Sequence, residues 1–304
     1  MTDILFYCGI NECQWNHHPV NTGPYAVVSP VYGTKVKENR VAVPDNAAVM
    51  QDSGAFCDGP EDRLDYAAAL RRQLEHSDKW GYSDKIIYRA SYDLLIDETW
   101  DGQGNREKRR WTESAANEAV EITVNAARYM RDNYDGPCVL SAQGVTARQY
   151  LECVRRVISI MDLSRDILGF GGWCIIGKMP RAMMPVLRDT IDLVIPYAAK
   201  QGVKKIHIWG VIYPKALGPL LRACDDYGIQ LSTDSAGPQM KPCMGSWGYG
   251  EWRNNHYEVA DPAIRGLERA RHVELTRQWL SAFRRTKYYV QKPNVQPRLF
   301  EVSA

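Results

Sequence analysis

Several features that often reveal a protein's class are missing from this 304-residue sequence. No apolar run approaches the roughly 20 residues needed to span a membrane, and the start, MTDILFYCGINECQWNHH, has no basic leader. No Cys-x2-Cys pair occurs, which argues against a zinc ribbon or a thioredoxin-like redox site. The cluster of Cys8, Cys13, His17 and His18 matches no common zinc spacing. We therefore expect a cytoplasmic protein that needs no metal or other cofactor.

Domain boundaries and strong charge are also lacking. No linker rich in Pro, Gly or Ser and no internal repeat occurs, so we expect one domain over 1–304, with a C-terminal helix and tail from about residue 260. The net charge of +2 does not by itself indicate a nucleic-acid-binding protein. Basic clusters at 106–110 and 284–289 could pair with phosphates, and the second adds two tyrosines for stacking. Each is also compatible with a solvated helix end.

Short apolar runs alternate with longer amphipathic stretches, which is typical of repeated βα units around a parallel sheet. The predicted strands cover 4–8, 25–30, 47–50, 85–88, 94–96, 138–142, 167–170, 205–209 and 229–232. The predicted helices cover 61–77, 112–133, 146–161, 181–201, 214–227 and 262–285. This pattern predicts an α/β protein with a (β/α)8 TIM-type barrel and a C-terminal helical extension.

Polar residues and glycines stand at the ends of successive predicted strands. They are Asp52, Asp97, Gln143, Gly171, Gly172, Gly210 and Asp234. In a (β/α) barrel the C-terminal ends of the strands converge on one face, where these folds build their active sites. Strand ends are often polar simply because loops begin there, so no single residue identifies a site. Three carboxylates and an amide on one face would nevertheless form a plausible one.

The segments around these residues resemble the tRNA-guanine transglycosylase superfamily in order and spacing, from about residue 29 to 238. They are VMQDSGAF (49–56), YDLLIDE (92–98), VLSAQGV (139–145), LGFGGWCIIG (168–177), IHIWGV (206–211) and LSTDSAGP (231–238). In that family an Asp-Ser-Gly-Gly-Phe segment carries the proton-transfer Asp, a later Asp-Glu reads guanine, and a further Asp is the nucleophile. The resemblance implies base exchange in a nucleic acid.

The resemblance implies that Asp52 is the acid/base and Asp234 the nucleophile. A carboxylate such as Asp234 can displace a base from its sugar and hold a covalent nucleosyl-enzyme. A single acid/base such as Asp52 can protonate the departing base and deprotonate the incoming one. The chemistry therefore needs two carboxylates with different tasks.

Base recognition is implied for a second group of residues. Asp97 resembles the carboxylate that reads guanine, whose adjacent N–H and amine it can accept in a fork. Gln143 and the Gly171 and Gly172 backbone resemble the remaining base contacts. Ser53 belongs to the loop after Asp52. Trp173, like Trp209 and Trp247, could stack on a flipped base or fill its place, although core packing is the better explanation for each Trp taken alone.

The departures from the family point to its DNA branch. The tRNA enzymes carry a Cys-x-Cys-x2-Cys and His zinc site near the C-terminus, and here only Cys243, His256 and His272 follow Asp234. The early Gly-Ile-Asn and Trp-Asn-His-His-Pro segments also resemble that branch, which inserts 7-deazaguanine bases into DNA. We expect a DNA-guanine transglycosylase whose partners are DNA, guanine and a 7-deazaguanine base such as the 7-cyano form.

Three alternatives remain open. A tRNA-guanine transglycosylase that lacks zinc would keep the same pocket. A non-catalytic barrel that binds nucleic acid or a deazaguanine would keep Asp97 and Gln143 and would not need Asp234. A retaining glycosidase also pairs two carboxylates but needs no set of guanine-reading groups.

Overall fold

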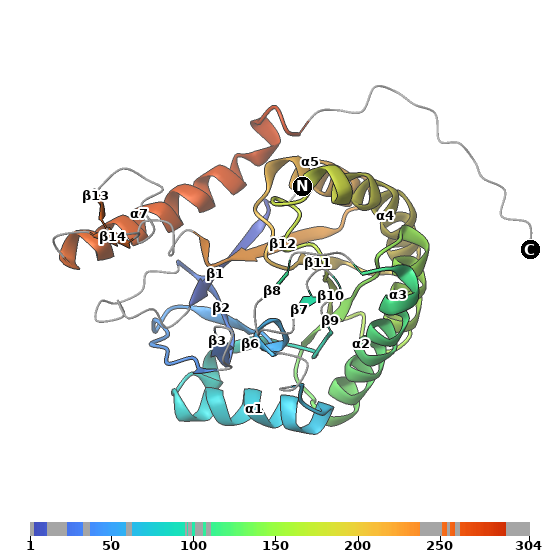
Figure 1. Ribbon diagram of the computed structural model, residues 1–304, viewed down its shortest axis with the longest axis horizontal. Helices are drawn as coiled ribbons and strands as arrows, with labels where there is room; N and C mark the ends of the chain where they lie inside the picture. Colours follow the sequence, from blue (N-terminus) through green and yellow to red (C-terminus); the bar gives the residue numbers. More distant parts are fainter. Residues whose placement is uncertain are drawn as a thin grey trace, which may run out of the picture.

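Eight parallel strands close into a barrel, as the computed structural model shows (Figure 1). The structure describes residues 3–10, 23–32, 37–58, 63–94, 96, 99–100, 106–107, 111–237, 251–253, 256–258 and 262–289. The strands, in their order around the barrel, are β1 Leu5–Ile10, β12 Gln230–Ser235, β11 Lys205–Ile208, β10 Ile167–Phe170, β9 Cys138–Ala142, β6 Ile86–Ala90, β5 Ala48–Gln51 and β2 Tyr25–Val28. The predicted TIM-type barrel is confirmed.

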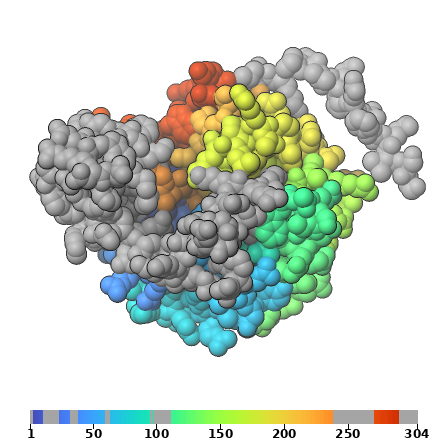
Figure 2. Space-filling model, in the orientation of Figure 1, coloured from blue at the N-terminus to red at the C-terminus, as the bar shows by residue number. Residues whose placement is uncertain are grey.

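Helices form the outer ring of the barrel. They are α1 Tyr66–Lys79, α2 Glu113–Asn133, α3 Ala147–Ile158, α4 Pro180–Lys200, α5 Pro214–Asp226 and α7 Pro262–Ser281, with the 3-10 turn η4 Phe283–Arg285 at the end. The space-filling view shows α1 in cyan, α2 and α3 in green, and α4 and α5 in yellow around the rim (Figure 2). No helix in the described part of the chain is both long and apolar enough to cross a membrane.

Local sequence sets where three of these helices begin. The side chains of Asp65, Thr112 and Thr146 each accept a hydrogen bond from the backbone N–H three residues further on. Such a cap stabilises a helix by about 1 kcal/mol. Because Asp65 is the cap, α1 begins at Tyr66 rather than at the predicted residue 61. Helices α4 and α5 begin instead with Pro in the first turn, where the missing N–H has no helical partner to lose.

The predicted strand over 94–96 is wrong. Leu94 and Ile96 follow β6 and belong to no strand. Ile96 is fully buried in a small cluster with Ala116, Ala119 and Val145. The run is apolar because α2 covers it, and burial alone does not require strand pairing.

Short antiparallel pairs extend three of the loops. They are β3 Val31–Tyr32 with β4 Lys37–Glu38, β7 Thr99–Trp100 with β8 Arg106–Glu107, and β13 Glu251–Arg253 with β14 His256–Glu258. Each pair is inserted after the C-terminal end of a barrel strand, β2, β6 or β12 respectively. These inserts therefore arise on the side of the barrel that carries active sites in this fold.

Apolar side chains fill the interior of the barrel. Tyr7, Val27, Met50 and Val139 belong to one buried cluster to which several strands contribute. Side chains alternate along a strand, so Asp52, two residues after Met50, faces the same interior one layer higher. The filled core thus supports polar residues at the C-terminal ends of the strands.

The C-terminal segment docks at the opposite end of the barrel. Arg284 Nε donates to Asp225 Oδ2 at 2.7 Å, and the Tyr289 hydroxyl donates to the same oxygen at 2.9 Å. Arg284 also lies 3.6 Å from Asp3, just before β1. Asp225 lies in the last turn of α5, shortly before β12 begins at Gln230, so Asp225 and Asp3 both lie near the N-terminal ends of strands. The basic cluster at 284–289 therefore lies away from the C-terminal face.

Candidate active site

Asp52 directly follows β5, and its backbone still pairs with the neighbouring strand β2. Its N–H donates to the carbonyl of Val28 in β2 at 2.9 Å, and its carbonyl accepts from Gln73 Nε2 of α1 at 3.0 Å. Its carboxylate Oδ1 accepts the N–H of Ser53 at 2.8 Å. Both the backbone and the carboxylate of Asp52 are therefore held in place.

The loop after Asp52 is fastened to α1. Arg72 donates to the carbonyl of the buried Ser53 at 2.8 Å and forms an ion pair with Asp58 at 2.8 Å. Gly54 has a φ of 82°, and a Cβ there would lie 2.7 Å from the Arg72 guanidinium, so glycine is required on both counts. The next aromatic residue, Phe56, lies in the 3-10 turn Ala55–Cys57 and is 43% exposed.

Asp234 lies within β12, opposite Tyr7 of β1 in the register. Its Oδ1 accepts two hydrogen bonds, from the backbone N–H of Gly210 at 2.7 Å and from His207 Nε2 at 3.1 Å. No hydrogen bond joins its Oδ2 to any residue that the structure describes. Its side chain is 15% exposed, so one oxygen is held by the protein and the other is left for a reactant.

The two carboxylates interact electrostatically. Burial raises the pKa of Asp52 above its ordinary value, and the negative charge of Asp234 raises that pKa further. The N–H of Ser53 opposes the shift through its hydrogen bond to the carboxylate. Like charges inside a barrel cannot both ionise cheaply, so Asp52 keeps its proton to a higher pH than an isolated aspartate does. The raised pKa suits a proton-donating role for Asp52.

Gln143 and the two glycines lie together across the barrel. Gln143 follows β9, is fully buried, and donates through Nε2 to the carbonyl of Leu94 and to Thr123 Oγ1. Its Oε1 is buried with no hydrogen-bond partner among the described residues. Cβ atoms placed on Gly171 or Gly172 would lie 3.8 Å from Gln143 Cβ. The structure therefore brings these three predicted residues to one place.

The tryptophans occupy different positions. Trp173 is fully buried, with its ring 5.7 Å from that of Tyr150 in the outer core. That is the position of a packing residue, and its stacking on a base stays a prediction. Trp209 is half-buried at the end of β11, where its Nε1 donates to Ser141 Oγ at 3.1 Å. Trp247 lies outside the described residues.

Asp97, the predicted guanine-reading residue, also lies outside the described residues, so its role stays a prediction. Another carboxylate of the same segment is described. A Cβ on Gly171 would lie 3.2 Å from Asp93 Oδ2, which places this carboxylate against the Gly171 backbone. Sequence reasoning passed over Asp93 because it stands before the end of the segment rather than at a recognised motif position.

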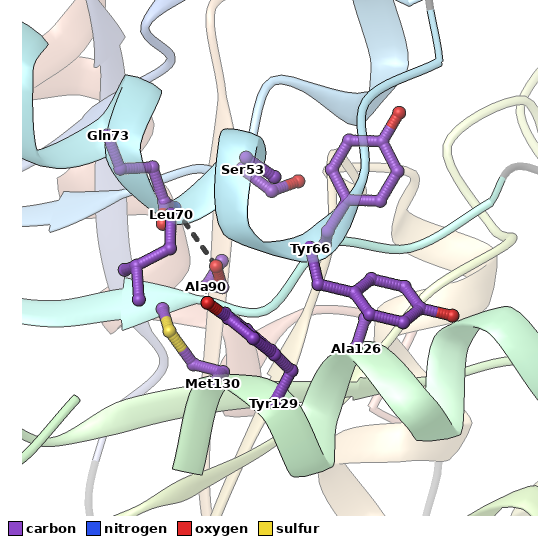
Figure 3. A pocket seen from close by; sticks show the side chains of 10 residues that line it. Ser53, Tyr66, Leu70, Gln73, Ala90, Ala126, Tyr129 and Met130 are labelled. Atoms are coloured by element: carbon purple, nitrogen blue, oxygen red, sulfur yellow. Dashed lines mark hydrogen bonds between the residues drawn. The ribbon is translucent and has the colours of Figure 1, made fainter. Parts of the chain in front are cut away.

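A narrow pocket lies behind the Asp52 loop, between α1 and α2 (Figure 3). It is lined by Ser53, Tyr66, Ala69, Leu70, Gln73, Ala90, Tyr92, Ala126, Tyr129 and Met130. None of these side chains carries a charge, and Gln73 donates to the carbonyl of Ala90 at 3.0 Å. The lining offers hydroxyl groups but no carboxylate, imidazole, amine or thiol, so the chemistry is not placed here.

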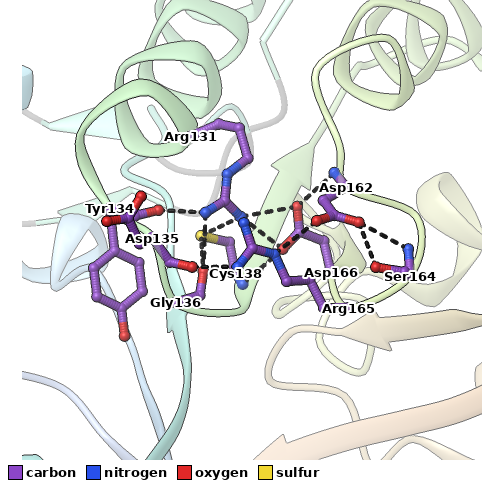
Figure 4. A network of polar contacts seen from close by, with 9 residues as sticks. All are labelled: Arg131, Tyr134, Asp135, Gly136, Cys138, Asp162, Ser164, Arg165 and Asp166. Atoms are coloured by element: carbon purple, nitrogen blue, oxygen red, sulfur yellow. Dashed lines mark hydrogen bonds and ion pairs between the residues drawn. The ribbon is translucent and has the colours of Figure 1, made fainter.

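A second polar cluster is structural (Figure 4). Asp166, just before β10, is fully buried and accepts from Arg131 Nη1, Cys138 N and Asp162 N, each at 2.9 Å. Arg131 also donates to the carbonyl of Gly136 at 3.1 Å. These bonds join the end of α2 to β9 and β10 at the N-terminal end of the barrel. Burial raises the pKa of the Cys138 thiol to about 12, so the thiol is not a nucleophile.

No metal site is evident in the part of the chain that the structure describes, where no group of three or more His, Cys, Asp or Glu side chains could hold an ion. Cys8 is buried in β1, and Cys13, His17 and His18 lie outside the described residues. The expectation of a protein without metal stays a prediction.

Comparisons with known proteins give little. No protein-family model and no curated protein matches the chain. Among solved structures, it is similar to a tri-modular GH5 (subfamily 4) endo-beta-1,4-glucanase from Bacillus licheniformis complexed with cellotetraose, with a TM-score of 0.36 and 9% identity. The match covers 90% of this chain and 59% of that chain. A likeness at these values says nothing about activity.

Proposed function

We propose that the protein exchanges guanine in DNA for a 7-deazaguanine base through a covalent nucleosyl intermediate on Asp234. The observation that carries the proposal is the pair of unlike carboxylates at the C-terminal end of the barrel. The pKa of Asp52 is raised by burial and by Asp234. Asp234 has one oxygen fixed by Gly210 and His207. The polymer and the bases rest on the sequence resemblance.

The proposed reaction has two displacements. Asp234 Oδ2 attacks the sugar carbon C1′ as the bond from C1′ to the guanine nitrogen breaks, and Asp52 gives its proton to the departing guanine. The incoming base then loses a proton to Asp52 and attacks C1′, which releases Asp234. Each step inverts C1′, so the sugar keeps its original configuration. Asp52 ends protonated and Asp234 ionised, as both began.

Recognition of the base is assigned to the other side of the barrel. The Gln143 Oε1, buried without a partner among the described residues, would accept an N–H of the base. The Asp93 carboxylate beside Gly171 would offer a second acceptor, in addition to Asp97. Guanine and 7-deazaguanine share the edge that donates from N1 and the exocyclic amine, so one set of acceptors suits both exchange partners.

DNA must present its base outside the duplex, because a stacked base cannot reach the strand ends of a barrel. Phe56, four residues after Asp52, and Trp209, just after β11, are the aromatic residues proposed to stack on the flipped base. The phosphate contacts are assigned to the cluster at 106–110, which begins in β8 after β6, on the C-terminal side of the barrel. The cluster at 284–289 docks at the other end.

The deciding experiment supplies labelled guanine or 7-cyano-7-deazaguanine with duplex DNA, single-stranded DNA and tRNA in parallel. We expect incorporation into DNA and a covalent DNA adduct that survives denaturation. The Asp234→Asn variant should form no adduct, with its fold and DNA affinity nearly unchanged, because an amide of the same shape is not a nucleophile. The exposed Asp189→Asn is the matched control and should behave like the parent.

Other outcomes separate the alternatives. Incorporation confined to tRNA would replace the DNA assignment by a tRNA-guanine transglycosylase without zinc. Base release that leaves abasic DNA, without incorporation, would indicate hydrolysis. Tight binding of DNA or of the deazaguanine with no adduct and no exchange would indicate a binding protein. Exchange by Asp234→Asn at the parental rate would refute the nucleophile.

A further inference from the structure

His207 is a buried histidine inside the barrel to which the proposed reaction assigns no step. It lies on β11, paired with Gly169 of β10 on one side and Ser232 of β12 on the other. Its side chain is fully buried. The ring nitrogens of a buried histidine are nearly always hydrogen-bonded. The partners of the two His207 nitrogens therefore indicate what the residue does.

Both ring nitrogens of His207 have partners. Nδ1 lies 2.9 Å from Ser232 Oγ, and Nε2 lies 3.1 Å from Asp234 Oδ1. The Ser232 hydroxyl is also 3.2 Å from the carbonyl of Ile206, to which it can donate. The ring therefore links a hydroxyl fixed to the strand backbone with the carboxylate of the proposed nucleophile.

The proton on Nε2 follows from the bonding. An ionised carboxylate only accepts hydrogen bonds, so Nε2 must carry a hydrogen whenever Asp234 is ready to attack. If the Ser232 hydroxyl donates to Nδ1, the ring is neutral; if it donates to Ile206, Nδ1 also carries a hydrogen. In both arrangements Nε2 donates to Asp234 Oδ1.

The surroundings of His207 restrain the ring. The Trp209 ring centroid lies 4.3 Å away in an edge contact, and that of Tyr7 lies 5.7 Å away, also edge-on. With both nitrogens bonded, two aromatic rings packed against it and no surface exposed, the imidazole cannot reach a sugar or a base. Its effect on the reaction must act through Asp234.

We infer that His207 is a positioning residue that, together with the Gly210 N–H, holds Asp234 Oδ1 so that Oδ2 faces the sugar carbon. Two donors on one oxygen prevent the carboxylate from rotating and leave the second oxygen as the nucleophile. Ser232 keeps the imidazole in the orientation that this requires. The inference deepens the proposed function and rests on it for the reaction, whereas the hydrogen bond itself can be observed without turnover.

The kinetic test compares His207→Leu and His207→Gln with the parent in single-turnover adduct formation on DNA. Misplacing a reacting group by about 1 Å lowers a rate about 10²-fold, and we expect a loss of that order for Leu with DNA affinity unchanged. Gln retains an amide donor and should recover part of the rate. The matched control is His76→Leu, which removes another buried histidine, on α1, bonded to Tyr82 and Asn39.

The spectroscopic test uses the 15N resonances of the histidine rings and needs no substrate. Replacing Asp234 by Ala should shift the Nε2 resonance of His207, and replacing the exposed Asp189 by Ala should leave it in place. An Nε2 resonance unchanged by Asp234→Ala would overturn the inference even if no His207 variant folds. A folded His207→Leu with the parental adduct rate would also overturn it. A parent that forms no adduct but shows the shift would refute only the proposed function.

Discussion

Gly169 leaves the space that the Trp209 ring occupies, and Gly169→Ala tests this packing directly. Gly169 lies in β10, paired with Ser141 of β9 and His207 of β11. A Cβ there would lie 2.9 Å from Trp209 Nε1 and 3.1 Å from Ser141 Oγ. Those two atoms are themselves hydrogen-bonded at 3.1 Å. The methyl group would therefore push between the two partners.

The expected loss combines three effects. Overpacking a well-packed interior costs about 1–3 kcal/mol. A broken hydrogen bond adds about 1 kcal/mol. Replacing Gly by Ala returns about 0.4–1 kcal/mol by restricting the unfolded chain. We expect Gly169→Ala to lower the free energy of unfolding by about 1–3.6 kcal/mol and, by displacing Trp209, to weaken binding of the base.

Urea unfolding followed by circular dichroism measures the change, with m-values compared to exclude altered denatured states. The matched control is Gly177→Ala, because a Cβ on Gly177 meets nothing nearer than 3.8 Å, from the Tyr213 ring. That variant meets no steric conflict, so it should be more stable than the parent by about 0.4–1 kcal/mol. Equal stability of the two variants would refute the packing argument for Trp209.

Four further predictions concern stability, docking and metal content. The raised pKa of Asp52 means that its ionised form destabilises the fold. Urea unfolding at pH 7 should therefore show Asp52→Asn to be more stable than the parent. This gain should vanish as the pH falls below about 3.9, the pKa of an aspartate in the unfolded chain. Asp166→Ala leaves Arg131 without its buried partner and should lower the free energy of unfolding by about 3–5 kcal/mol in the same assay. A Cβ on Gly218 would overlap the carbonyl oxygen of Tyr288, so Gly218→Ala should expose the C-terminal segment to limited proteolysis; an unchanged digestion pattern would contradict the docking. Elemental analysis should find no stoichiometric zinc, and one zinc per chain whose removal lowers stability would reveal a missed site.

The barrel could be predicted from the sequence because its elements are specified locally. Apolar runs mark the buried strands, and side chains such as Asp65, Thr112 and Thr146 cap helices through bonds to residues three positions away. The strand predicted over 94–96 is wrong because an apolar run shows burial without showing strand pairing. Ile96 is apolar because a helix covers it, and composition does not reveal which element covers a segment.

Some features of the candidate site follow from the sequence, and others depend on the tertiary structure. That Asp52, Gln143, Gly171 and Asp234 share one face follows from their places at strand ends, which the sequence shows. Other features come from barrel closure, which brings together strands far apart in the sequence at a fixed register. Such features are the pKa of Asp52 raised by Asp234, the bond from His207 to Asp234, the burial of Trp173 with Trp209 left half-buried, and the docking of Arg284 at the opposite end. A period of two residues says which side chains share a face of one strand, but only the register between strands decides which of them touch.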